Sequence, residues 1–215
     1  MLGDVLLITD KHREAGEAII QKVLEQRKPK MIITISGESG SGKSELGHVV
    51  AKGLRKQGIM AKCLCTDNYY KVLPLERSVW RKKNIVEKSV GYGEYDWDTL
   101  ARTIDDFKHG REAKMPCVDL VTEQVDTQIT DFSSIEMLVI DGLYAIKTEG
   151  SDLRVFIELT YHETKKAQVV RGKEPQNDFR MSVLEQEHKM VQALKSTADL
   201  LVNMDYKVGP AIVSR

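Results

Sequence analysis

Short runs of apolar residues alternate with longer amphipathic stretches along most of the chain. The apolar runs are typical of buried strands, and they predict strands at residues 31–36, 59–66, 137–140 and 153–159. Elsewhere apolar residues recur at every third or fourth position, which predicts helices at residues 13–27, 43–56, 98–108, 162–171 and 179–195. Strands separated by helices in this way predict right-handed β-α-β units around a mostly parallel sheet.

Two further segments extend this pattern. Val5 to Ile8 form a short strand-like run ahead of the first helix, and Pro29 ends that helix. Residues 117–130 alternate apolar and polar positions, which predicts a β-hairpin beside the main sheet. Because no repeat, low-complexity tract or linker divides the sequence, we expect one domain with an N-terminal extension at 1–30 and a core at 31–204.

The composition favours a soluble globular protein over a membrane protein or a basic nucleic-acid binder. Of the 215 residues, 41% are hydrophobic and 30% are charged, which is typical of a soluble globular chain. The formal net charge is zero, so a globally basic nucleic-acid binder is not expected. No window reaches the roughly 18 consecutive apolar residues of a membrane-spanning helix, and no signal-peptide pattern is present. We therefore expect a cytoplasmic protein without a membrane or nucleic-acid partner.

The cysteines and one basic stretch carry weaker signals. Cys63, Cys65 and Cys117 lack the spacing of zinc or redox sites, so reduced structural thiols are expected. Cys63 and Cys65 alternate along a predicted strand and should share one face. Residues 71–88 are rich in lysine and arginine. They form either a solvated helix face or a positively charged entrance to a binding site that attracts phosphorylated ligands.

The strongest motif runs from Gly37 to Ser44 and fits G-x-x-x-x-G-K-[ST] between a predicted strand and a predicted helix. Glycines let successive backbone N–H groups wrap a polyphosphate at a helix N-terminus. Lys43 is expected to reach the β- and γ-phosphates, and the Ser44 hydroxyl to bind Mg²⁺. A glycine-rich turn with a chance lysine is the alternative. The predicted nucleotide-binding residues are Gly37, Ser39, Gly40, Ser41, Gly42, Lys43 and Ser44.

Two carboxylates follow predicted strands. Asp141 ends the apolar run that begins at Met137, which is where P-loop proteins place an acid near the metal; because Gly142 follows, a cap or turn role is the alternative. Asp67 follows the strand after the P-loop helix. In an open α/β sheet this edge lines the ligand crevice, and a carboxylate there can accept the proton of an acceptor hydroxyl. An Asx-turn is the competing interpretation of Asp67.

These motifs, and the order in which they follow one another along the chain, resemble those of the uridine kinase and phosphoribulokinase family of P-loop kinases. The segment Thr66 to Tyr70 is similar to the family's Asp-Ser-Phe-Tyr segment, whose aspartate is the catalytic base. The Asp141 strand end is similar to the family's Val-Glu-Gly-Ile segment, with aspartate in place of glutamate. Further similar segments lie at residues 95–100, 110–119 and 198–203.

The resemblance implies a fold and a set of residues. The fold class is α/β: a three-layer P-loop NTPase-type sandwich with a mostly parallel sheet flanked by helices and a small substrate-side β-hairpin. Arg171 and Arg180 fall where the family carries an arginine-rich lid, so they are expected to offset transition-state charge together with Lys43, unless they form a solvated helix surface.

The acceptor-binding positions depart from the family pattern. Where uridine kinases hold the base with tyrosine, histidine and arginine, this chain has Val118, Glu123 and Val125, and Val90 replaces the ribose-binding aspartate. An apolar side chain cannot form hydrogen bonds with a ribose diol. The resemblance therefore implies an acceptor other than uridine or cytidine. Weaker candidates for lining its pocket are Tyr69, Tyr70, Tyr92 and Glu123, although the tyrosines are also ordinary packing residues.

The function expected from these residues is that of an ATP- and Mg²⁺-dependent kinase. It would phosphorylate a hydroxyl of a nucleoside, sugar or related metabolite, with Asp67 as base and Ser44 and Asp141 at the metal. The alternative is an ATP-binding regulatory or scaffold protein without phosphoryl transfer. A GTPase or an ABC-type ATPase is not favoured, because neither an Asn-Lys-x-Asp nor a Ser-Gly-Gly-Gln segment is present. The oligomeric state, including a homo-oligomer, stays open.

Overall fold

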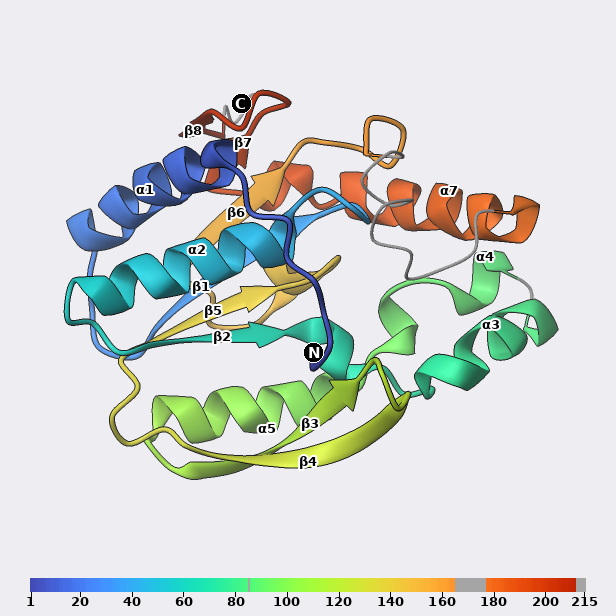
Figure 1. Ribbon diagram of the computed structural model, residues 1–215, viewed down its shortest axis with the longest axis horizontal. Coiled ribbons are helices and arrows are strands. Elements are labelled where there is room, and N and C mark those ends of the chain that lie inside the picture. The colour runs from blue at the N-terminus through green and yellow to red at the C-terminus, as the bar shows by residue number, and fades with distance from the viewer. Residues whose placement is uncertain (85, 165–176, 212–215) are drawn as a thin grey trace.

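The computed structural model describes residues 1–84, 86–164 and 177–211. A six-stranded sheet in the order β2-β5-β1-β6-β7-β8 forms its centre, and a separate β3-β4 hairpin lies beside it (Figure 1). The strands are β1 (Met31–Gly37), β2 (Ala61–Cys65), β3 (Glu112–Asp119), β4 (Gln124–Asp131), β5 (Met137–Asp141), β6 (Leu153–Ile157), β7 (Leu200–Val202) and β8 (Val208–Pro210). In the six-stranded sheet, neighbouring strands from β2 through β5, β1 and β6 to β7 pair in parallel, and β8 is antiparallel to β7. Strands β3 and β4 pair antiparallel.

Helices cover both faces of the sheet. They are α1 (Asp10–Glu25), α2 (Lys43–Lys56), α3 (Pro74–Lys83), α4 (Val86–Ser89), α5 (Trp97–Lys108) and α7 (Asp178–Gln192). Four short 3₁₀ turns complete the elements: η1 (Thr66–Tyr69), η2 (Tyr92–Glu94), η3 (Ala145–Lys147) and η4 (Lys195–Thr197). Figure 1 shows α1 and α2 on one side of the sheet and α5 with the hairpin on the other.

Alternate residues of the central strands build two separate cores. On one face, Ile33 and Val139 pack with apolar residues of α1 and α2. On the other face, Ile32 and Leu138 pack with α5 and with the inner side of the hairpin. Because β1 and β5 are buried on both faces, their sequences are nearly continuous apolar runs, as parallel strands require.

The N-terminal extension packs onto the core through small residues. Gly16 of α1 lies so close to α2 that a Cβ atom would be 2.4 Å from Val49 Cγ1. Ahead of α1, the chain crosses to the hairpin, where Leu2 forms a parallel bridge with Asp119. The extension therefore spans the distance between α2 and the hairpin.

The predicted α/β sandwich with its parallel sheet and hairpin is confirmed. Every predicted strand from residue 31 onward is present, although β2 is shorter than residues 59–66 and β3 already begins at Glu112. The strand predicted from Val5 to Ile8 is wrong: this run forms no strand, and Val5 is 66% exposed. Of the helix predicted at 162–171, residues 161–164 form a turn and the remainder lies outside the described residues.

Helix α3 lies in the basic stretch 71–88, for which a solvated helix face was one of the two expectations. No apolar period marks it, because its apolar residues face solvent, as Leu75 at 60% and Val79 at 53% exposure illustrate. Helix α4 and strand β8 were not predicted, because they are too short to carry a period. Among the described helices, none is long and apolar enough to cross a membrane.

Gly142, directly after β5, provides a test of the packing. A Cβ atom on Gly142 would lie 1.7 Å from Thr66 Oγ1 and 2.9 Å from Thr66 Cβ, and Thr66 is fully buried. We expect Gly142→Ala to lower the free energy of unfolding by about 1–3 kcal/mol through overpacking. Urea denaturation measures this change. The control is Gly93→Ala, which meets no atom within 4 Å and should leave stability within about 0.5 kcal/mol.

Candidate active site

The loop between β1 and α2 has the backbone of an anion cradle. Gly40 and Gly42 adopt left-handed φ angles of 78° and 88°, so the chain turns tightly before α2 begins at Lys43. No side chain caps this helix N-terminus. The dipole of α2 favours a negatively charged group at this helix N-terminus.

Two further features of this loop fit a polyphosphate. Ser41 Oγ is buried without a hydrogen-bond partner in the part of the chain that the structure describes. Lys43 Nζ donates to the carbonyl oxygen of Glu38 at 2.7 Å, which places its ammonium group across the loop. An orphaned hydroxyl and a lysine at an uncapped helix N-terminus together match the chemistry of bound phosphate.

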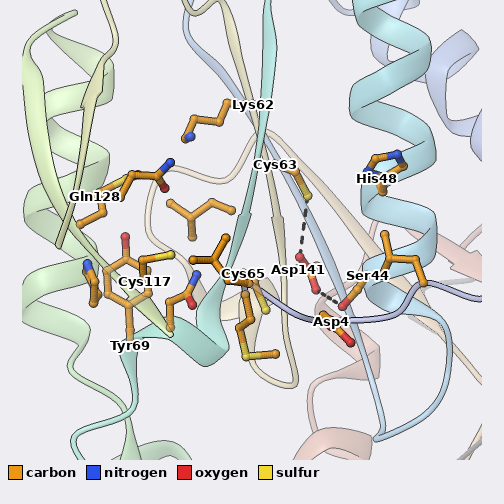
Figure 2. Close-up of a pocket in the computed structure, with 17 residues that line it drawn as sticks. Asp4, Ser44, His48, Lys62, Cys63, Cys65, Tyr69, Cys117, Gln128 and Asp141 are labelled. Carbon is orange, nitrogen blue, oxygen red and sulfur yellow. Dashed lines mark hydrogen bonds between the residues drawn. The ribbon is translucent and has the colours of Figure 1, made fainter. Parts of the chain in front are cut away.

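Asp141 at the end of β5 lies next to the loop. Because β5 pairs with β1, Ile35 is its register partner, and Ser44 Oγ donates to Asp141 Oδ2 at 2.7 Å (Figure 2). Only 2% of Asp141 is exposed, and this burial is the main cause that raises the pKa of its carboxyl. The hydrogen bond from Ser44 lowers the pKa, and the charge of Asp67 raises it.

These two side chains fit a magnesium ion that arrives with a nucleotide. Mg²⁺ is typically held by one or two protein oxygens together with substrate phosphates and waters. Ser44 and Asp141 supply such a pair. Among the described residues, no group of three or more His, Cys, Asp or Glu side chains could hold a metal without other ligands.

Asp67 follows β2 in the turn η1 and faces the same end of the sheet. The Tyr95 hydroxyl lies 3.5 Å from Asp67 Oδ1 and donates to the Tyr70 hydroxyl at 2.6 Å. Because β2 pairs with β5 and Cys65 is the register partner of Asp141, the two carboxylates lie at the same end of neighbouring strands, and the charge of Asp67 contributes to the raised pKa of Asp141. The turn itself is held to the hairpin, because Asn68 Oδ1 accepts a hydrogen bond from Val118 N at 3.0 Å.

The predicted acceptor-lining residues are scattered. Tyr70 lies beside the Asp67–Tyr95 contact and under the Arg77 guanidinium, 3.5 Å from the ring centroid. Tyr69 lines the cavity beside Ser44 and Asp141, and its hydroxyl donates to Thr103 Oγ1. The Tyr92 ring stacks on Trp97. Glu123 lies in the hairpin turn, with a φ of 58°.

Helix α7 brings Arg180 to the phosphate loop. Arg180 donates to Ser39 Oγ at 3.3 Å and lies 3.7 Å from the Glu187 carboxylate. Arg171, the other arginine predicted for the lid, lies outside the described residues. The structure thus brings one of the two predicted arginines to the loop.

Glu38 was missed by sequence reasoning, because the phosphate-loop motif leaves its position unspecified. Its side chain is 1% exposed. The carboxylate accepts hydrogen bonds from Tyr161 N at 2.8 Å, from His188 Nδ1 at 2.8 Å and from Gln192 Nε2. Glu38 therefore ties the loop to the helix that carries Arg180.

A cavity of about 260 Å³ adjoins the Ser44–Asp141 pair. It lies between β2, α2, the hairpin and the N-terminal segment, and all three cysteines line it (Figure 2). Cys63 Sγ lies 3.8 Å from Asp141 Oδ1, and burial with this negative neighbour raises the pKa of the thiol. The cysteines are free, and Cys63 and Cys65 face Asp141 together, as their alternation in the sequence predicts.

Comparison with known proteins shows the family of the chain. A sequence model described as the phosphoribulokinase/uridine kinase family matches residues 32–171, well over half of the chain. The chain belongs to this family. Its named members are kinases, so the chain is a phosphotransferase with an alcohol group as acceptor, and the alternative of a protein without phosphoryl transfer is not favoured.

Individual relatives are distant. A uridine kinase from Ureaplasma parvum is 26% identical over 166 residues, which cover 74% of this chain and 77% of the relative. A bifunctional alpha-galactosidase/sucrose kinase from Mediterraneibacter gnavus is 24% identical over 192 residues, 83% of this chain but 20% of that protein. A solved structure described as a possible uridine kinase from Bacillus stearothermophilus superposes with a TM-score of 0.66 at 18% identity, covering 88% of this chain and 97% of the other.

Asp141→Asn tests the metal pair. The raised pKa of Asp141 means that ionisation at neutral pH costs folding free energy, and the amide removes this cost while still accepting from Ser44. We expect a higher melting temperature than wild type at pH 7, and no gain at a pH below the ordinary pKa of aspartate, where the carboxyl is protonated in both states. Thermal melts at both pH values measure this.

The same variant should lose the extra stabilisation that Mg²⁺ adds to ADP in the wild type. The exposed Asp98→Asn is the control and should keep it. An Asp141→Asn protein whose melting temperature still responds to Mg²⁺ in the presence of ADP would contradict the assignment of this residue to the metal.

Proposed function

We propose that the chain transfers the γ-phosphoryl group of ATP to a hydroxyl of a small metabolite, in the presence of Mg²⁺. The observation that carries the proposal is that Asp67 follows β2 while Asp141 ends the neighbouring strand β5, so that both lie at the end of the sheet where the phosphate loop opens. A loop that only holds a nucleotide has no use for a second carboxylate at this position. Family membership and the absence of a side-chain cap at the N-terminus of α2 support the same conclusion.

Each residue has a role in this reaction. Asp67 accepts the proton of the acceptor hydroxyl as its oxygen attacks the γ-phosphorus, and the bond to the β-phosphate oxygen breaks in line. The Tyr95 hydroxyl, which donates its proton to Tyr70, lies 3.5 Å from the Asp67 carboxylate. Lys43 and Arg180 offset the charge that develops on the transferred group. Mg²⁺, bound by Ser44 and Asp141, would neutralise the phosphate oxygens.

The acceptor that the site favours is neither uridine nor cytidine. Val90 and Val118, which stand where uridine kinases carry polar contacts, are only 4% and 3% exposed. Buried valine side chains offer a nucleoside no hydrogen bonds. The relatives include a uridine kinase and a protein with sucrose kinase activity, so both nucleosides and sugars are acceptor classes to test.

An acceptor screen tests this specificity. With ATP and Mg²⁺, we expect uridine and cytidine to be poor acceptors and one compound among sugars, sugar phosphates, glycerate and pantothenate to turn over. Formation of ADP coupled to phosphorylated product, followed by ³¹P NMR, is the measurement. Efficient phosphorylation of uridine would contradict our interpretation of Val90 and Val118.

Asp67→Asn tests the base. Removing a general base typically slows transfer by about 10²–10⁴-fold, whereas the affinity for ADP should change little because Asp67 does not contact the loop. Asp67→Glu should retain part of the activity, since it keeps a carboxylate at the site. Asp98→Asn, which removes an exposed carboxylate from α5, is the matched control and should be fully active. An Asp67→Asn variant with wild-type turnover of the best acceptor would exclude Asp67 as the base.

A further inference from the structure

Two aromatic rings from opposite ends of the chain pack against the backbone of the phosphate loop. Tyr206 lies in the turn between β7 and β8, and His12 lies in the first helical turn of α1. Their ring centroids are 4.7 Å apart at an interplanar angle of 63°, and each residue is only 8% exposed. Both lie outside residues 32–171, the part of the chain that the family description covers.

Tyr206 fixes the orientation of one peptide group of the loop. Its hydroxyl donates a hydrogen bond to the carbonyl oxygen of Ser41. No peptide bond in the described residues is cis, so the C=O of Ser41 and the N–H of Gly42 point in opposite directions from one planar group. With the carbonyl directed outward to Tyr206, the Gly42 N–H is directed to the inner side of the loop, where it can donate to a phosphate oxygen.

Gly42 is the residue at which this orientation is easily lost. Glycine visits many backbone conformations, so the peptide that precedes it can rotate at little cost. Here the two rings occupy the space beside it: a Cβ atom on Gly42 would lie 2.0 Å from Tyr206 Oη and 2.6 Å from His12 Nε2. The aromatic pair therefore both requires glycine at this position and restricts its movement.

Tyr206 is itself held in a strained conformation. Its φ of 62° is uncommon for a residue with a side chain. The Asn203 side chain stabilises the turn, because its Oδ1 accepts from the backbone N–H groups of Asp205 and Lys207, each at 2.9 Å. Because the Asn203 hydrogen bonds maintain this strained conformation, the position of the Tyr206 side chain is expected to have a role.

We propose that Tyr206, backed by His12, is a positioning residue that holds the Ser41–Gly42 peptide in its phosphate-binding orientation. The inference rests on the proposed function in that a nucleotide must bind the loop. It assigns a role to the two chain ends: the N-terminal helix and the C-terminal turn together pre-organise the cradle before the nucleotide arrives. Nucleotide binding then does not carry the free-energy cost of rotating the Ser41–Gly42 peptide.

Tyr206→Phe tests the proposal, because it removes the hydroxyl and keeps the ring. Titration calorimetry with Mg·ADP should show affinity about fivefold weaker than wild type, the equivalent of one lost hydrogen bond. Lys207→Ala is the matched control from the same turn. It breaks only an exposed ion pair with Glu14 and should bind Mg·ADP like the wild type.

Thermal melts of the ligand-free proteins separate positioning from simple stabilisation. A lower melting temperature with unchanged Mg·ADP affinity in Tyr206→Phe would show a structural role only and would overturn the inference. Such a result leaves the proposed kinase activity untouched. A wild-type protein that failed to bind Mg·ADP would overturn both.

Discussion

Burial of the Asp141 carboxylate at the end of the sheet where the phosphate loop opens is the constraint around which this site is built. Asp67 and Asp141 end neighbouring strands of a parallel sheet, and the charge of Asp67 raises the pKa of buried Asp141. Without compensation, such a pair would favour protonation of one partner. The compensating groups converge on Asp141: the Ser44 hydroxyl donates to it, and Lys43 from the phosphate loop lowers its pKa. A cation that arrives with a nucleotide would neutralise the remaining charge of the two carboxylates.

The loop that receives the nucleotide is braced from several directions. Glu38 joins it to α7, which carries Arg180. On the other side, the Tyr206 hydroxyl binds the Ser41 carbonyl. Both contacts come from segments that follow the phosphate loop by more than a hundred residues. The backbone donors of the loop are therefore fixed by tertiary structure and not by the glycine-rich motif alone, as pre-organised electrostatic sites require.

The sequence predicts the parts of this arrangement that depend on local pattern. The phosphate loop, β1, β5 and α2 follow from an apolar run, a motif and an amphipathic period, and the positions of Asp67 and Asp141 follow from where strands end. Glu38 and Tyr206 could not be predicted, because their partners lie more than a hundred residues away and neither belongs to a motif. Val5 to Ile8 was misread for a related reason. An apolar run predicts a strand only if another strand is available to pair with it.

The central claim is that the Asp67 carboxylate faces the terminal phosphoryl group of a nucleotide on the phosphate loop, with room between them for an alcohol. The most direct measurement is a crystal structure of the protein with Mg²⁺ and a non-hydrolysable ATP analogue. The account predicts an Asp67 carboxylate directed at the γ-phosphate across a gap that fits one hydroxyl, with Ser44 and Asp141 at the cation. An Asp67 side chain turned away from the γ-phosphate, or a gap filled by protein atoms, would contradict it.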